Sequence, residues 1–125
     1  INIVQQTPNM TIHPNPKDIR SLAADCTIYL CPMDNGGGLK LRIMDGLRAG
    51  QPVILHKRSA RGYEILSHKT YFQTYNDINS FIKAIQAIHT YIASDAYSRQ
   101  TIQEEYYTFF GLEQGINRLK EILCK

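Results

Sequence analysis

The sequence has few of the features that mark specialised protein classes. Its 125 residues contain three cysteines, Cys26, Cys31 and Cys124, without the spacing of a zinc site. An odd number of cysteines in such a chain favours reduced thiols and a reducing compartment. No run of about 18 apolar residues could span a bilayer. These absences predict a cytoplasmic protein that needs no metal.

The net charge of the chain is also small. Lys and Arg number 14 and Asp and Glu number 11, so the net charge is +3. That excess is too weak to predict a nucleic-acid interface, which gathers positive charge on one face. The hydrophobic content of 43% and charged content of 20% are ordinary for a globular protein. The length fits one domain and excludes a two-domain enzyme contained within this chain.

What the chain does contain is an alternation of short apolar runs and longer helical patterns. We expect strands at 1–4, 10–13, 27–32, 52–56 and 71–75, and helices at 17–24, 39–49, 63–67, 77–94 and in the C-terminal segment. The runs at 27–32 and 52–56 are continuously apolar, which is typical of parallel strands buried on both faces. The predicted fold class is therefore α/β, a Rossmann-like open parallel sheet with helices on both faces.

Three consecutive glycines, Gly36 to Gly38, separate the strand at 27–32 from the helix at 39–49. Glycines here let a ligand approach the backbone closely, and the free N–H groups at a helix amino end attract anions such as phosphate. The segment matches neither the P-loop nor the dinucleotide-binding pattern. A plain structural turn therefore remains an alternative for it.

The residues around this turn resemble a known family. The run Gly36-Gly-Gly-Leu-Lys40-Leu-Arg-Ile-Met-Asp45-Gly46, followed by Ala49-Gly-Gln-Pro-Val-Ile54, is similar to the C-terminal domain of GT-B glycosyltransferases. It looks most like the retaining group-1 (family 4) enzymes. The preceding strand and Gly62-Tyr-Glu64 also resemble that family, so that the likeness extends over roughly residues 10–122.

The resemblance implies a role for each matching position. The diphosphate of a nucleotide-sugar donor would bind Gly36, Gly37, Gly38, Leu39 and Lys40. Asp45 stands where the family has a glutamate that binds the ribose hydroxyls, and its shorter side chain reaches less far. A second family glutamate, eight residues earlier, corresponds to Gly37 here. No catalytic residue is therefore assigned within this chain.

The same resemblance implies a further domain, a donor substrate and a cellular location. The chain would be a fragment of the donor-binding domain, inactive alone, and the acceptor would bind a separate N-terminal domain that is absent here. The donor is a nucleotide sugar, and no metal or other cofactor is implied. Members of the family often work at the inner membrane face, although no residue of this sequence indicates membrane contact.

Two other functions remain open. The first is a noncatalytic α/β module that binds a small anion or a protein partner, which the glycine at position 37 and the short Asp45 favour. The second is a receiver-like domain, which would need an acid pair near its amino end that this chain lacks.

For several single residues, a structural role is the alternative to a functional one. Gly46 inside a helix indicates close packing rather than ligand contact. His56 ends a strand and either faces the cleft or is passive. Glu64 either lines that cleft or is a surface charge, and Arg58 and Arg61 either bind acidic groups or only aid solubility.

Overall fold

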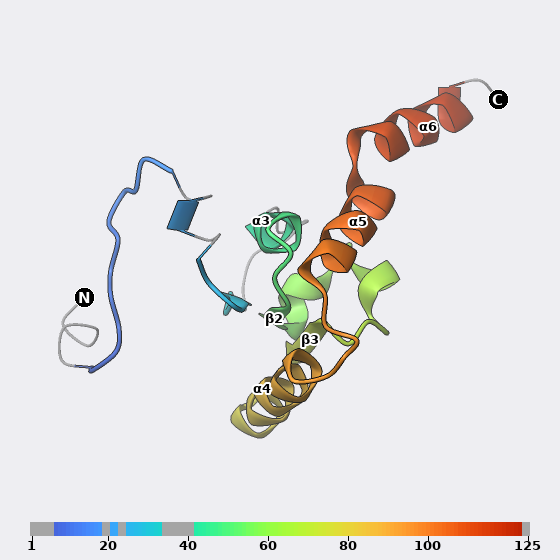
Figure 1. The fold of residues 1–125 in the computed structure, drawn as a ribbon. Helices are drawn as coiled ribbons and strands as arrows, with labels where there is room; N and C mark the ends of the chain where they lie inside the picture. Colours follow the sequence, from blue (N-terminus) through green and yellow to red (C-terminus); the bar gives the residue numbers. More distant parts are fainter. Residues whose placement is uncertain (1–6, 19–20, 23–24, 34–41, 124–125) are drawn as a thin grey trace.

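The computed structural model describes residues 7–18, 21–22, 25–33 and 42–123. Its elements are β1 (Tyr29–Cys31), α3 (Arg42–Arg48), β2 (Val53–His56), the 3-10 turns η1 (Lys57–Ala60) and η2 (Glu64–Leu66), β3 (Phe72–Tyr75), α4 (Ile78–Ile92), α5 (Arg99–Phe110) and α6 (Leu112–Leu123). Figure 1 shows α3 and α4 on opposite sides of the strands. The alternation confirms the predicted α/β class.

The three strands form one parallel sheet in the order β1-β2-β3. Tyr29 pairs with Val53, and Val53 pairs with Phe72, so that each strand is in register with the next. The unit β1–α3–β2 is therefore the predicted βαβ crossover. Because all three strands are parallel, their carboxyl ends lie along one edge of the sheet.

The sheet is covered on both faces, but unequally. Val53 and Leu55 of β2 pack with Ile43 of α3 and Ile102 of α5 in the larger core. Ile54, between them in sequence, points to the other face and packs with Ala84 and Ile88 of α4. The alternation along β2 and its continuous burial confirm the prediction that helices lie on both faces.

Two helix ends match their sequence signals. Gly50 follows α3 with a φ of +77°, the left-handed conformation that glycine adopts at little cost. An added Cβ there would lie 2.6 Å from the carbonyl oxygen of Arg99, so that α5 approaches the end of α3 closely. Asp77 caps α4, accepting a 2.7 Å hydrogen bond from the N–H of Ser80.

The amino-terminal part of the chain departs from the prediction. Residues 10–13 form no strand, and Met10 and Ile12 are exposed. Prolines at 8 and 14 flank the stretch, and Asn9 and Asn15 have positive φ angles, which interrupt an extended strand. Lys17 and Asp18 are not helical, so the helix predicted to begin at 17 was wrong in its start. The strand predicted at 1–4 lies outside the described residues.

Candidate functional site

The predicted donor-binding residues follow the carboxyl end of β1. The described chain stops at Met33 and resumes at Arg42, the first residue of α3. Gly36, Gly37, Gly38, Leu39 and Lys40 therefore lie outside the described residues. What the structure supplies is their frame, because β1 and α3 are in place on either side of them.

A buried serine fixes the near end of that frame. The hydroxyl of Ser59, in η1, donates a hydrogen bond to the carbonyl oxygen of Met33. Ser59 is fully buried, so this bond is shielded from competing water. The segment that leaves β2 is thereby joined to the segment that leaves β1.

Asp45 lies on α3 with a half-exposed side chain. Its carboxylate is 3.8 Å from the guanidinium of Arg48, one turn later on the same helix. Both side chains are about 37% exposed, so this ion pair is weak. Arg48 also donates a 3.2 Å hydrogen bond to the hydroxyl of Tyr106, and this bond raises the pKa of Arg48. The ribose-binding role of Asp45 stays a prediction.

Gly46, the next residue, has the packing role that its position in a helix indicated. A Cβ at Gly46 would lie 2.6 Å from the ring of Tyr29 in β1. Only a glycine lets α3 approach β1 this closely. Burial raises the pKa of Tyr29 above its ordinary value, and nearby Asp45 adds to that shift.

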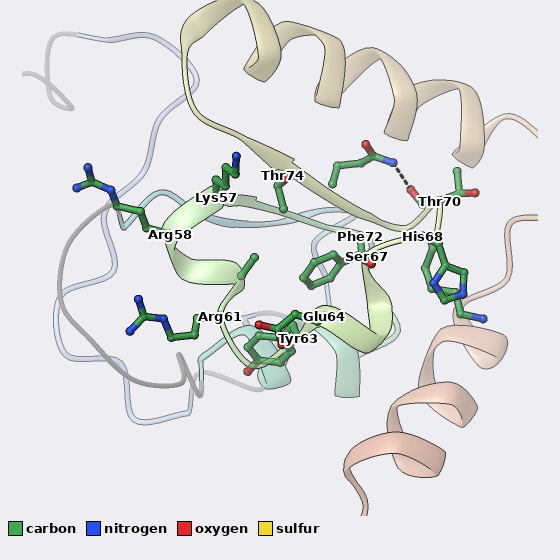
Figure 2. Close-up of a pocket in the computed structure, with 13 residues that line it drawn as sticks. Lys57, Arg58, Arg61, Tyr63, Glu64, Ser67, His68, Thr70, Phe72 and Thr74 are labelled. Atoms are coloured by element: carbon green, nitrogen blue, oxygen red, sulfur yellow. Dashed lines mark hydrogen bonds between the residues drawn. The ribbon is translucent and has the colours of Figure 1, made fainter.

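A pocket of about 750 Å³ lies between β3 and the segment that leads to it from β2. We call it the basic pocket. Its lining residues are Lys57, Arg58, Ala60, Arg61, Tyr63, Glu64, Ser67, His68, Lys69, Thr70, Phe72, Gln73 and Thr74. Figure 2 shows Arg58 and Arg61 extending on one side and His68 and Thr70 at the opposite end. Tyr63 and Phe72 are buried, with ring centroids 6.1 Å apart.

Positive charge dominates the pocket. Lys57, Arg58 and Arg61 come from one stretch of five residues, whereas Glu64 is the only carboxylate in the lining. Backbone hydrogen bonds lower the pKa of Glu64, and Arg61 contributes to the same direction. Lys69 is already paired with Glu105 at 3.2 Å. The excess of cations over carboxylates in the lining favours an anionic ligand.

A smaller hollow of about 440 Å³ lies at the carboxyl ends of the strands, on the α4 face. His56 lines it and packs edge-on against Tyr75 with ring centroids 5.4 Å apart. Nδ1 of His56 accepts a 3.2 Å hydrogen bond from the N–H of Arg58. A neutral imidazole therefore carries its proton on Nε2. His56 thus lines this hollow, and whether it faces a ligand stays a prediction.

The structure brings together some residues that the sequence singled out and adds others. Arg58, Arg61 and Glu64 line one pocket, a grouping that the sequence did not predict. Lys57 and Ser59 were missed. A signal for Lys57 was present, because three cations within five residues directly follow a strand that ends at the ligand-binding edge. No local signal identified the bond of Ser59, since its acceptor is a backbone oxygen 26 residues away.

Comparison with known proteins adds no family assignment. The chain matches no protein-family model, and neither the curated proteins nor the solved structures gave a significant match. Within the described parts of the chain, no helix is both long and apolar enough to cross a membrane.

Proposed function

We propose that this chain is the donor-binding portion of a glycosyltransferase and binds the diphosphate of a nucleotide sugar. One observation carries the proposal. The glycine-rich stretch Gly36–Lys40 connects the carboxyl end of β1 to α3 in a parallel βαβ unit, the position at which such sheets hold anionic ligands. The likeness of residues 36–54 to GT-B donor domains supports the choice of ligand. The three-stranded sheet is compatible with a part of such a domain.

The chemistry follows from the charge that develops during sugar transfer. The bond between the sugar's anomeric carbon and the diphosphate oxygen breaks, and an acceptor hydroxyl oxygen forms the new bond and loses its proton. The leaving diphosphate gains negative charge. Backbone N–H groups at Gly36–Lys40 and the ammonium of Lys40 would stabilise that charge electrostatically. The acceptor and the group that takes its proton belong to a further domain in this proposal.

The cations after β2 support the same ligand. Ser59 is hydrogen-bonded to Met33, so η1, which contains Lys57 and Arg58, lies beside the chain where it leaves β1. Positive charge at this edge raises the local concentration of a phosphate-bearing ligand.

A second function is favoured by the basic pocket itself. Three cations face one carboxylate in a hollow of about 750 Å³, which suits a small anion without any sugar transfer. A noncatalytic anion-binding module therefore remains the competing proposal, and the choice of ligand separates the two.

The test is an amide NMR titration of the 14.3 kDa chain with UDP, GDP, ADP and inorganic pyrophosphate. Donor binding predicts shifts at Gly36–Lys40 with one nucleoside diphosphate, at concentrations at which pyrophosphate has little effect. Equal shifts with all four ligands, centred on Lys57–Arg61, would favour the anion module. Unchanged spectra at 10 mM of every ligand, about 100-fold above a dissociation constant of 0.1 mM, would contradict both.

A matched pair of variants localises the charge. Lys40→Ala removes the ammonium assigned to the diphosphate, and a fivefold or greater weakening of nucleoside diphosphate binding is expected. Lys83→Ala removes an equal charge from the exposed surface of α4 and should leave affinity unchanged. Equal effects of the two variants would show that only net charge matters.

A further inference from the structure

The helix α6 has an apolar stripe that none of the described residues covers. Leu112, Ile116, Leu119 and Leu123 follow one another at intervals of four, three and four residues. All four are exposed, Leu112 by 82% and Leu123 by 78%, and α6 buries no residue. Figure 1 shows α6 continuing beyond α5 at the end of the molecule away from α4.

The spacing is that of a heptad repeat. Leu112 and Leu119 occupy its d positions, and Ile116 and Leu123 occupy its a positions. The b, c and f positions hold Gln114, Asn117, Arg118 and Glu121, all polar. Ile122, 69% exposed at a g position, widens the stripe on one flank. A stripe with apolar residues at every a and d position is suited to packing against one other helix with the same repeat. We propose that α6 pairs antiparallel with α6 of a second copy of this chain.

The antiparallel register follows from the residues. Placing Leu112 opposite Leu123 of the second copy also places Ile116 opposite Leu119, so that both core layers are filled. In that register Glu113, at an e position, lies beside Lys120 at the e position of the second copy. Two-fold symmetry adds the reciprocal pair, Lys120 with Glu113 of the second copy, on the same flank. A parallel pair would instead place Lys120 beside Gly115, and no such ion pair would form.

The charges also argue against a lipid surface as the occupant. The exposed polar positions of α6 include Glu113 and Glu121 as well as Arg118 and Lys120. A helix that binds anionic membranes carries an excess of positive charge on its polar face, and α6 has none. The stripe is less than two heptads long, so the pairing is weak and depends on protein concentration.

The primary test is sedimentation equilibrium of the 125-residue chain between about 10 and 500 μM. A reversible monomer–dimer equilibrium is expected, and Leu119→Glu should raise the dimer dissociation constant at least tenfold. Asn117→Glu adds the same charge at a b position and should leave that constant within twofold. Since α6 buries no side chain, circular dichroism should show that both variants keep the folded body. A wild-type chain that is monomeric at 500 μM overturns the proposal.

A charge exchange tests the register. Glu113→Lys and Lys120→Glu should each weaken the dimer severalfold, and the double variant should restore it, because each pair then has opposite signs again. Failure of the double variant to restore dimerisation overturns the antiparallel register. Binding of α6 to anionic vesicles by a chain that stays monomeric would identify a lipid occupant and refute self-pairing. None of these results depends on nucleotide binding, so the donor proposal is tested separately.

Discussion

The helices α5 and α6 are adjacent in the chain and equal in length, yet their surroundings differ completely. Each has 12 residues, and Gly111 separates them. α5 buries Ile102 and Tyr106 in the larger core, whereas α6 buries nothing. The more regular apolar stripe belongs to α6. Periodicity therefore indicates that a helix face will be covered, but it does not say whether the same chain supplies the cover.

Polar contacts explain why α5 is held. The guanidinium of Arg99 donates a 3.0 Å hydrogen bond to the carbonyl oxygen of Ala49. The side-chain amide of Gln103 donates a 3.1 Å hydrogen bond to the backbone carbonyl oxygen of Arg48. Both acceptors lie at the carboxyl end of α3, whose last carbonyls lack partners within the helix. On the other side, the hydroxyl of Tyr71 donates to Glu105. α5 thus completes hydrogen bonds that the rest of the fold leaves open.

The largest expected difference between the two helices is in the free energy of unfolding that each loses when one isoleucine is replaced by alanine. Ile102→Ala empties a fully buried position in α5 and should lower the free energy of unfolding by about 2–5 kcal/mol. Ile116→Ala, in α6, should lower it by less than about 1 kcal/mol at concentrations below those of dimer formation. Urea unfolding followed by circular dichroism measures both. Similar losses for the two variants would break the distinction between an anchored and an uncovered helix.

Replacing a glycine by alanine near each helix should change stability in opposite directions. Gly50→Ala forces a side chain into a left-handed conformation and against the backbone of Arg99 at the start of α5, at a cost of about 1–3 kcal/mol. A Cβ at Gly115 in α6 would meet nothing within 4 Å. Gly115→Ala should therefore stabilise the helix by up to about 1 kcal/mol. Thermal unfolding of dilute samples would reveal the two signs, and a destabilising Gly115→Ala would show that α6 has a cover within the chain.

The smallest effect concerns the ionisation of the residue that holds α5 to β3. Burial raises the pKa of Tyr71 above its ordinary value, and the hydrogen bond to Glu105 raises it further. In the unfolded chain Tyr71 would lose its proton near pH 10. A raised pKa in the folded state means that its contribution to stability is full below pH 10 and declines as the pH rises above it.

Tyr71→Phe should accordingly remove the equivalent of about one proton from the decline of stability between pH 10 and 11.5. The wild-type chain, measured over the same pH range, is the reference. Denaturant titrations at a series of pH values measure these slopes. An unchanged slope in Tyr71→Phe would mean that folding does not raise the pKa of the Tyr71 phenol.

Much of the fold was predictable because its elements have strong local signals. The strands at 52–56 and 71–75 and the helix at 77–94 lie within two residues of the observed β2, β3 and α4. The apolar run at 52–56, the helical spacing of the apolar residues after Asp77 and the acidic cap at Asp77 are local properties of the chain. The prediction of a strand at 10–13 was wrong because two apolar residues without a paired strand bury too little surface to hold an extended conformation.

The candidate site was predictable in part. Close packing at Gly46 could be inferred from the cost of glycine in a helix, and Tyr29 is the residue that it contacts. The ion pair of Asp45 with Arg48 follows from helical spacing and was not predicted. The basic pocket could not be derived from local patterns, because β3 supplies one wall and the turns η1 and η2 supply the other.

The bond from Ser59 to Met33 has a mechanical consequence. It joins the exits of β1 and β2 through a hydroxyl group that is itself buried. One side chain therefore holds together two segments that are 26 residues apart in the sequence, and Ser59→Ala would remove that link.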